Sequence, residues 1–346
     1  MSKINEQDYT DYLELINDGH SQRSACKILG LKRSTLQDYI KRKQKGMDCV
    51  EQEVMNGIIG NDYSNWITKE KPPIRFDVVE DLKEKKPLSK TEPVVLYYDL
   101  ECSPTNAFIW RRFKENISQA QILNEWYLLT QSWAFNDKEI EGSKLSGAEA
   151  LAQDDEPLVL QVWHLLNNAD IVVGHNLRKF DIKKINARFA YYNLPNPSPY
   201  KIIDTYEICK AKFAFPSNKL NDVCSYLGIG VKEDTGGFKT WSECVKGNED
   251  ALEHMMRYNL QDVHLTRELY KRLRGFDNNG VNASIMVDQT GMICSTCASD
   301  DVEVIEDKFV YTPNGRYQAY RCNSCQTTLR HTTKVGNSNK LVRVTT

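Results

Sequence analysis

The stretch VVLYYDLEC (residues 94–102) decides how this chain of 346 residues is interpreted. Its β-branched and aromatic residues predict a buried strand. Asp99 and Glu101 stand two positions apart in this strand. Because side chains alternate between the two faces of a sheet, both carboxylates project from the same side. Two acids on an apolar strand are costly unless a positive charge compensates them, and a divalent metal ion is the economical partner.

Further along the chain, apolar strands alternate with amphipathic helices. A helix is predicted at 158–168, followed by a strand within ADIVVGHN (169–176). Asp181 begins the next helix, and Tyr258 and Asp262 lie four residues apart in a long amphipathic helix, on one face of it. Taken alone, Asp181 is also explained as an acid favoured at a helix N-terminus, and a lone tyrosine such as Tyr258 is more often an ordinary packed aromatic. This alternation predicts an α/β domain over residues 94–274.

Three short motifs in this domain occur in a recognisable order. DLE (99–101), HNxxxFD (175–181) and YNxxD (258–262) resemble the motifs of DEDD 3′–5′ exonucleases, the DnaQ-like branch of the ribonuclease H-like fold. Tyr258 stands four residues before the last acid, and Arg257 occupies the place of the histidine of the other subclass, so the tyrosine (DEDDy) subclass is indicated. The segments DLECSP (99–104), GHNxxxFD (174–181), KLNDVCSYLGI (219–229) and YNLQDV (258–263) are most similar to exonuclease domains of family B DNA polymerases and to YprB-type relatives.

The resemblance implies a chemistry and a set of residues. Two Mg²⁺ or Mn²⁺ ions would be held by four carboxylates and would support phosphodiester hydrolysis that releases nucleoside 5′-monophosphates from a 3′ end. The implied metal ligands are Asp99, Glu101, Asp181 and Asp262, and these acids with Tyr258 are the implied catalytic residues. His175 and Asn176 shape the turn before Asp181 or touch the nucleic acid. A degraded, inactive fold is the competing interpretation.

The N-terminal segment GHSQRSACKILGLKRSTLQDYIKRKQKG (19–46) is basic, with eight Lys and Arg from His20 onward against one acid. Three short helices are predicted within residues 8–43, with a tight turn at Gly30. The segment resembles the helix-turn-helix of resolvases and invertases, and a protein-interaction bundle of three helices is the alternative. The resemblance implies DNA contacts by Arg33, Ser34, Thr35, Gln37, Lys41 and Arg42.

Four cysteines in two CxxC pairs mark the C-terminal module: Cys294, Cys297, Cys322 and Cys325. A β-hairpin with Pro-Asn-Gly at its turn is predicted between the pairs. This arrangement is typical of a zinc ribbon with one structural Zn²⁺, against a disulfide pair or an iron–sulfur site. Arg316 and Arg321 flank two tyrosines that either hold single-stranded nucleic acid or cover the hairpin.

The chain thus divides into five predicted segments: a helix-turn-helix at 1–46, a linker at 47–93, the ribonuclease H-like exonuclease domain at 94–274, a linker at 275–290, and a zinc ribbon with a basic tail at 291–346. The expected fold class is α/β, a ribonuclease H-like mixed sheet flanked by helices. The chain is also expected to contain a small all-α helix-turn-helix domain and a small β zinc ribbon.

Composition limits the class of protein. Lys and Arg number 45 and Asp and Glu 47, for a net charge of -2, which excludes a uniformly basic coat protein and an acidic disordered chain. No run of 18 apolar residues provides a transmembrane helix, and no export signal is visible. Ten cysteines are then expected to be reduced, in the cytoplasm of a bacterium or a phage-infected host.

The expected partners are DNA, as single-stranded 3′ ends and as a duplex at the helix-turn-helix, and no membrane. RNA, and a replication protein or polymerase acting in trans, remain open as partners. The expected enzyme is therefore a metal-dependent 3′–5′ exonuclease of DNA replication, repair or recombination. Two alternatives remain: an RNA-processing exonuclease of the same fold, and a DNA-binding regulator or replication adaptor with secondary nuclease activity.

Overall fold

The computed structural model describes residues 6–17, 22–36, 90–277, 280–313 and 315–336. The chain divides into two compact units, Met1–Glu70 and Lys71–Thr346. The basic segment belongs to the first unit. The predicted exonuclease and cysteine modules lie together in the second.

The first unit contains helices α1 (Glu6–Asn17) and α2 (Gln22–Ile28) and a helical turn at residues 33–36. Tyr12, Ala25, Cys26 and Leu36 form its small buried core. Gly30 has a φ of +65°, and the N–H of Leu31 donates to the carbonyl of Cys26 (2.9 Å), which closes α2 at the predicted turn. Of the residues expected to contact DNA, Gln37, Lys41 and Arg42 lie outside the described residues.

A five-stranded mixed sheet forms the centre of the second unit, in the order β5-β4-β1-β6-β7. The central strand β1 (Val95–Cys102) pairs antiparallel with β4 (Leu128–Phe135) and parallel with β6 (Ile171–Gly174). The edges are β5 (Glu141–Lys144) and β7 (Lys201–Asp204). The apolar runs of β1, β4 and β6 are explained by this position, since the three inner strands are covered on both faces.

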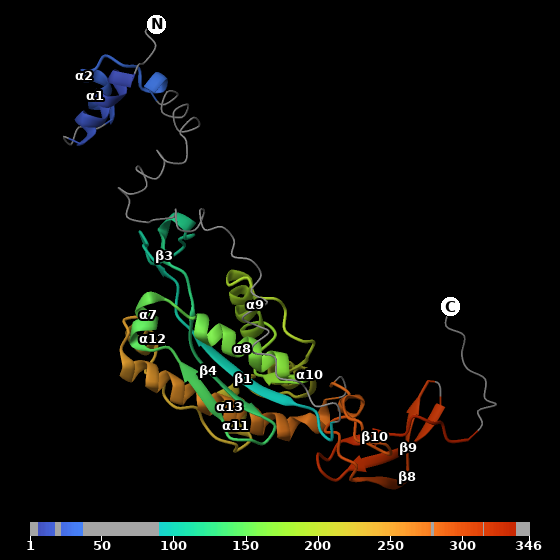
Figure 1. Ribbon diagram of the computed structural model, residues 1–346. Coiled ribbons are helices and arrows are strands. Elements are labelled where there is room, and N and C mark those ends of the chain that lie inside the picture. The colour runs from blue at the N-terminus through green and yellow to red at the C-terminus, as the bar shows by residue number, and fades with distance from the viewer. Residues whose placement is uncertain (1–5, 18–21, 37–89, 278–279, 314, 337–346) are drawn as a thin grey trace, which may run out of the picture. The chain divides into compact units, whose positions relative to one another are not determined.

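Helices cover both faces of the sheet, as Figure 1 shows for α8 and α13. On one face, Leu96, Tyr98 and Leu100 of β1 pack into a core. Helices α7 (Gly147–Ala152), α8 (Glu156–Asn168) and α9 (Asp181–Tyr191) contribute to this core. On the other face lie α10 (Thr205–Lys212), α11 (Leu220–Tyr226) and α13 (Glu249–Leu273), with α12 (Phe238–Cys244) packed against α13. The mixed sheet flanked by helices confirms the predicted α/β fold class.

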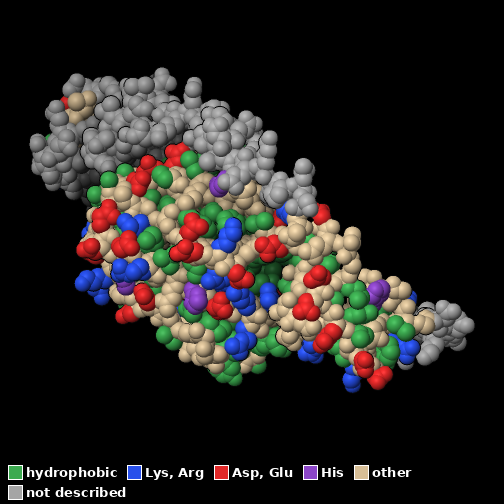
Figure 2. Space-filling view, turned by 60° about the horizontal axis from the view of Figure 1, so that its bottom comes forward, with side chains coloured by type: hydrophobic (Ala, Val, Ile, Leu, Met, Phe, Trp, Pro, Cys, Tyr) green, Lys and Arg blue, Asp and Glu red, His purple; other side chains and the backbone are tan. Residues whose placement is uncertain are grey.

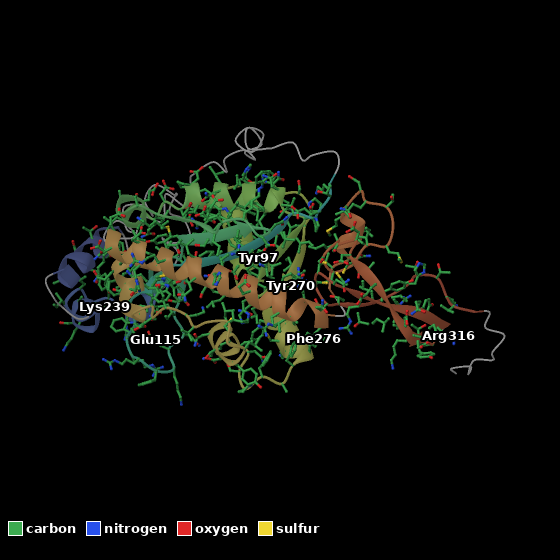
Figure 3. All side chains as sticks on the ribbon, turned by 90° about the horizontal axis from the view of Figure 1, so that it is seen from below. Tyr97, Glu115, Lys239, Tyr270, Phe276 and Arg316 are labelled. Carbon is green, nitrogen blue, oxygen red and sulfur yellow. The ribbon has the colours of Figure 1, made fainter. Side chains whose placement is uncertain are left out.

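The length and position of α13 matter most for the site. The side chain of Asn248 accepts the N–H of Ala251 at its start (3.2 Å), and acidic residues in the first turn and basic residues in the last match the helix dipole. Tyr270 of α13 packs against Tyr97 of β1 with ring centroids 6.2 Å apart (Figure 3). This packing fixes α13 across the face of β1 that carries Asp99 and Glu101.

A connecting segment with its own short secondary structure joins β1 to β4. It contains the short strands β2 (Asn106–Ala107) and β3 (Ile122–Asn124), which pair antiparallel, and the 3-10 helix η1 (Gln119–Gln121). The residues between β2 and η1 lie outside both cores.

The C-terminal module is a three-stranded antiparallel sheet. Its strands are β8 (Val302–Thr312), β9 (Gly315–Cys322) and β10 (Thr328–Arg330), in the order β10-β9-β8. Thr312 pairs with Gly315, so the hairpin turn lies where the sequence predicts it.

The segment predicted as a linker at 275–290 packs onto the domain. It begins within η2 (Arg274–Phe276) and contains η3 (Ala283–Met286). Ala283 is fully buried in the core shared with α13, and its N–H donates to the carbonyl of Ser295 (2.7 Å). The linker expectation relied on the Gly and Asn content of this segment and took no account of such tertiary contacts.

The charges of the second unit are mixed. Figure 2 shows acidic and basic side chains interspersed over the visible face of the described residues, so this face carries no extended field of one sign. None of the helices in the described part of the chain combines the length and the hydrophobicity that crossing a bilayer requires.

Candidate active site

Strand β1 and helix α13 bring three of the predicted acids together. Asp99 and Glu101 project from the face of β1 that α13 covers, and Asp262 lies in the middle of α13. One carboxylate oxygen from each of the three residues lies within 4.8 Å of the others. The cluster is therefore assembled by tertiary packing between distant parts of the sequence.

Asp181, the fourth predicted acid, begins α9 and is 3% exposed. It stands outside the group of oxygens that meet within 4.8 Å, but its charge raises the pKa of Asp99, and the charge of Glu101 in turn raises the pKa of Asp181. Its Oδ1 atom is buried without a hydrogen-bond partner, as is Oδ1 of Asp262. Two buried carboxylate oxygens are thus left unsatisfied beside the cluster.

Burial and mutual repulsion disfavour the charged forms of these acids. Burial is the largest cause for each, and it raises the pKa of Glu101 to about 7 and that of Asp181 to about 8. The pKa of Asp99 is raised well above its ordinary value, first by burial and then by the charges of Asp262, Asp181 and Glu101. These acids can carry their negative charges together only where a cation compensates them.

The donor set fits a hard divalent cation. Every candidate ligand atom is a carboxylate oxygen, the type that Mg²⁺ and Mn²⁺ prefer, and the unsatisfied oxygens of Asp181 and Asp262 provide free coordinating positions. The residues present at this site could therefore hold a divalent metal ion.

Lys232 is a functional candidate that the sequence interpretation did not include. Its ammonium group donates to the phenol oxygen of Tyr258 (2.7 Å) and to a carboxylate oxygen of Asp262. It comes from a non-helical segment that two hydrogen bonds fasten: the N–H of Lys232 donates to Asn221 of α11 (2.9 Å), and that of Glu233 to Gln261 of α13 (2.9 Å). The sequence around Lys232 has no periodic pattern that would indicate a contact with Tyr258 and Asp262.

Two further polar side chains orient the carboxylates of β1. The Nδ2 atom of Asn259 donates to Asp99 (2.5 Å), and the indole N–H of Trp241 in α12 donates to Glu101. Asn259 lies within the YNxxD motif, so the motif itself was the signal for it. Nothing in the sequence around Trp241 indicated its contact, which depends on α12 packing against α13.

The turn before α9 is fixed by its own hydrogen bonds. Asp204 accepts the N–H groups of Asn176 (2.8 Å) and Arg178 (3.1 Å), and Asn176 adopts a left-handed conformation with a φ of +64°. His175 contacts the carbonyl of Asn218 and the hydroxyl of Thr205, each at 2.9 Å, and burial lowers its pKa to about 4. His175, whose imidazole is neutral at pH 7, and the side chain of Asp204 therefore shape the turn that precedes Asp181.

The four cysteines of the CxxC pairs form a second cluster. Their sulfur atoms lie within 4.8 Å of one another, and the pairs Cys294–Cys325 and Cys297–Cys322 are each 3.6 Å apart. A disulfide has sulfurs about 2.05 Å apart, whereas four ligands about 2.3 Å from one Zn²⁺ lie about 3.8 Å apart. Hydrogen bonds from the other thiols hold the pKa of Cys325 well below its ordinary range, so a thiolate is already favoured.

The described residues contain five further cysteines. Cys26, Cys102, Cys209, Cys224 and Cys244 are free and buried among apolar side chains. They take no part in either cluster.

The predicted nucleic-acid contacts of the C-terminal module divide into exposed and covered groups. Arg316 and Arg321 are exposed, and the guanidinium of Arg316 lies over the ring of Phe309 (4.4 Å). Tyr317 is 7% exposed beneath the guanidinium of Arg330 (4.3 Å), so this ring covers the hairpin. In the first unit, Arg33 and Ser34 are exposed and Thr35 is half-buried.

Comparison with known proteins identifies the central domain. A family model described as RNase_H superfamily, RNase_H_2, matches residues 107–274. Residues 107–274 form an RNase H-superfamily domain. The match includes Asp181, Tyr258 and Asp262, and it begins five residues after β1 ends.

Two individual proteins are similar to this chain. Protein NEN4 of Arabidopsis thaliana is 35% identical over 98 residues, which are 28% of this chain and 36% of NEN4. The chain therefore spans about a third of the length of this curated relative. The solved structure of the family B DNA polymerase from the hyperthermophilic archaeon Pyrobaculum calidifontis matches at 17% identity and a TM-score of 0.41, over 56% of this chain and 26% of the polymerase.

Proposed function

We propose that this protein is a metal-dependent 3′–5′ exonuclease of the DEDDy type that acts on DNA. The observation that supports this most strongly is the meeting of the Asp99, Glu101 and Asp262 oxygens within 4.8 Å, beside the buried Asp181. Asp181 and Asp262 belong to the residues that match the RNase H superfamily, and Asp99 and Glu101 lie on the strand just before them. The metal ligands are these four acids, and the catalytic residues are the same acids and Tyr258.

The reaction is hydrolysis of the last phosphodiester bond of a strand. The four carboxylates would hold two Mg²⁺ or Mn²⁺ ions, which when bound would supply an activated water and stabilise charge on the leaving oxygen. The water oxygen forms a bond to phosphorus while the bond to the 3′ oxygen of the preceding nucleotide breaks and that oxygen takes up a proton. The products are a nucleoside 5′-monophosphate and a strand with a new 3′-hydroxyl.

Tyr258 acts here as a neutral hydrogen-bonding group. Its pKa is raised above its ordinary value, first by burial and then by the charge of Asp262, so the phenol keeps its proton at pH 7. Lys232 holds the phenol oxygen at 2.7 Å. This geometry supports a role in orienting the attacking water, because a protonated phenol cannot serve as the general base.

The appended modules favour DNA as the substrate and DNA replication, repair or recombination as the process. The first unit would bind a duplex as a helix-turn-helix through Arg33, Ser34 and Thr35, with Gln37, Lys41 and Arg42 following in the sequence. The cysteine cluster would hold one structural Zn²⁺, with Arg316 and Arg321 on the surface of the ribbon. We further propose that a replication protein or polymerase acts with this enzyme in trans. The enzyme would work in the cytoplasm of a bacterium or of a phage-infected host.

The experiment that tests this function compares two substrates and one variant. Single strands of DNA and RNA with a 5′ label are incubated with the full chain in Mg²⁺ or in EDTA, beside the Asp262→Asn variant. We expect a ladder of products that shorten from the 3′ end, and we expect it to form faster on DNA than on RNA. It should appear only with Mg²⁺ and only with the parental chain. Faster shortening of RNA would make the protein an RNA-processing exonuclease, and an uncleaved substrate would contradict the proposal.

A further inference from the structure

The segment of residues 108–118, between β2 and η1, exposes large apolar side chains. Trp110 is 94% exposed and Phe113 is 80% exposed. Three more of its side chains are at least half exposed: Phe108, Ile109 and Ile117. Aromatic side chains of this size are ordinarily buried in cores or interfaces, and a group of them on the surface marks a binding site.

Basic residues are interleaved with these aromatic ones. Arg111, Arg112 and Lys114 are all exposed, and Glu115 is the single acid of the segment, which leaves a charge of three minus one, or +2. The Glu115 carboxylate accepts the backbone N–H groups of Trp110 (3.1 Å) and Arg111 (2.8 Å). Glu115 thus fixes the backbone of the segment, while the three basic side chains are exposed to solvent.

The segment has a defined conformation. Gln121 donates to Glu115 (2.9 Å) and to the carbonyl of Phe108 (3.0 Å), and its own carbonyl accepts the N–H of Phe108 (2.8 Å). In Figure 3 the chain around Glu115 extends beyond the helices of the domain. A surface presented in this way loses little conformational freedom when it binds.

The segment also begins close to the acidic cluster. Strand β1 carries Asp99 and Glu101 and leads directly into β2, so Trp110 follows Glu101 by nine residues. At about 3.3–3.6 Å per residue, Trp110 lies within about 30 Å of Glu101. A strand whose 3′ end lies at the carboxylates is therefore within reach of this segment over a few nucleotides.

We propose that residues 108–118 bind the unpaired strand of a nucleic-acid substrate, upstream of the nucleotide that is cleaved. Bases stack on Trp110 and Phe113, and Arg111, Arg112 and Lys114 pair with phosphates, the combination that holds single strands without reading their sequence. This inference rests on the proposed exonuclease function and names how that site receives its strand. The positive charge of the segment favours a nucleic-acid strand as its ligand, because three exposed cations pair with phosphates and gain nothing from an apolar protein surface or a neutral bilayer.

The test measures binding, so it does not depend on hydrolysis. Fluorescent single strands of about 2 nucleotides, too short to span from the carboxylates to Trp110, and of about 20 nucleotides, as DNA and as RNA, are titrated in EDTA with the full chain and with the Trp110→Ala/Phe113→Ala variant. We expect affinity for the longer strand to fall roughly 10- to 100-fold with the loss of two stacking platforms. Affinity for the shorter strand should change less than about threefold. Phe276→Ala, which removes an aromatic side chain that is 59% exposed at the end of α13, is the matched control and should change neither.

Three outcomes are decisive, and the first two separate this inference from the proposed function. A chain that digests nucleic acid with Mg²⁺, but whose double variant binds the longer strand with unchanged affinity, would overturn this inference alone. A chain that binds through Trp110 but cleaves nothing would contradict the exonuclease proposal and leave the segment as a strand-binding surface. Loss of binding to anionic vesicles in the double variant, with strand binding intact, would assign the segment to a membrane and overturn the inference.

Discussion

The ammonium nitrogen of Lys232 lies 2.7 Å from the phenol oxygen of Tyr258, and the same group contacts Asp262. The charge of Asp262 and these two hydrogen bonds outweigh burial and raise the pKa of Lys232 above its ordinary value, so the side chain is cationic. Lys232 thus provides a positive charge beside Asp262 and fixes the position of the phenol.

The first prediction concerns this pair. Tyr258→Phe removes one hydroxyl and no charge, so we expect the rate of hydrolysis to fall about 10- to 100-fold, as for the loss of one positioning group. Lys232→Met should reduce the rate at least as much and should also lower the unfolding temperature in EDTA, because it removes a cation that compensates Asp262. Rates on a single-stranded substrate and calorimetry in EDTA measure both effects. Equal stability of Lys232→Met and the parental chain in EDTA would contradict this role.

The second prediction concerns Asp99. Asp99→Asn keeps the acceptor oxygen for Asn259 and removes one charge from a group of mutually repelling acids. In EDTA the variant should therefore be more stable than the parental chain, by about 0.5–2 kcal/mol, while hydrolysis falls at least about 100-fold. Chemical unfolding in EDTA and a rate assay in Mg²⁺ check the two halves. Asp222→Asn, an exposed acid in the first turn of α11, is the control and should change neither quantity.

The third prediction is a pH dependence with a defined sign. The pKa values of Glu101 and Asp181 are raised to about 7 and about 8, so the folded chain without metal binds more protons than the unfolded chain between about pH 4 and pH 8. Its stability should therefore fall as pH rises through this window. Mg²⁺ competes with these protons, so the stabilisation that it provides should grow over the same range.

Thermal unfolding at pH 6 and pH 8.5, in EDTA and in Mg²⁺, measures this dependence. The upward shift in unfolding temperature with Mg²⁺ should be larger at pH 8.5, and Glu101→Gln should reduce the difference between the two pH values. A Mg²⁺-induced shift that is the same at both pH values would show that these carboxyls do not hold the ion.

The fourth prediction concerns the cysteine cluster. The purified protein should contain about one Zn²⁺ per chain, and Cys322→Ser should lose it and unfold the three-stranded sheet. Elemental analysis and amide hydrogen exchange over residues 291–336 measure the two effects. Cys244→Ser, which changes a buried cysteine outside the cluster, should keep the zinc. Iron in place of zinc, or a full complement of zinc in Cys322→Ser, would contradict the ribbon.

The parts of the fold and site that follow local rules could be predicted from the sequence. The β-branched run of β1 and the alternation of strand side chains placed Asp99 and Glu101 on one face. Helical spacing placed Tyr258 and Asp262 together on α13, and the CxxC spacing identified the cysteines that meet. Each of these depends on residues close together in the chain, where periodicity and spacing carry the information.

The parts that depend on tertiary contacts could not be predicted. Lys232 reaches Tyr258 only because Asn221 and Gln261 fasten a segment without periodicity. Trp241 reaches Glu101 only because α12 packs against α13. The exposure of Trp110 was likewise hidden, since a tryptophan in sequence is as readily a core residue as a surface one.

The claim on which the account depends is that Asp99, Glu101 and Asp262 hold divalent metal. The most direct measurement is an anomalous difference map from crystals of the full chain soaked in Mn²⁺, recorded beside the same map for Asp262→Asn. We predict a strong peak within coordinating distance of all three carboxylates, absent or much weaker in the variant. A protein that hydrolyses DNA but whose map shows Mn²⁺ elsewhere, with no peak among these three residues, would contradict the account.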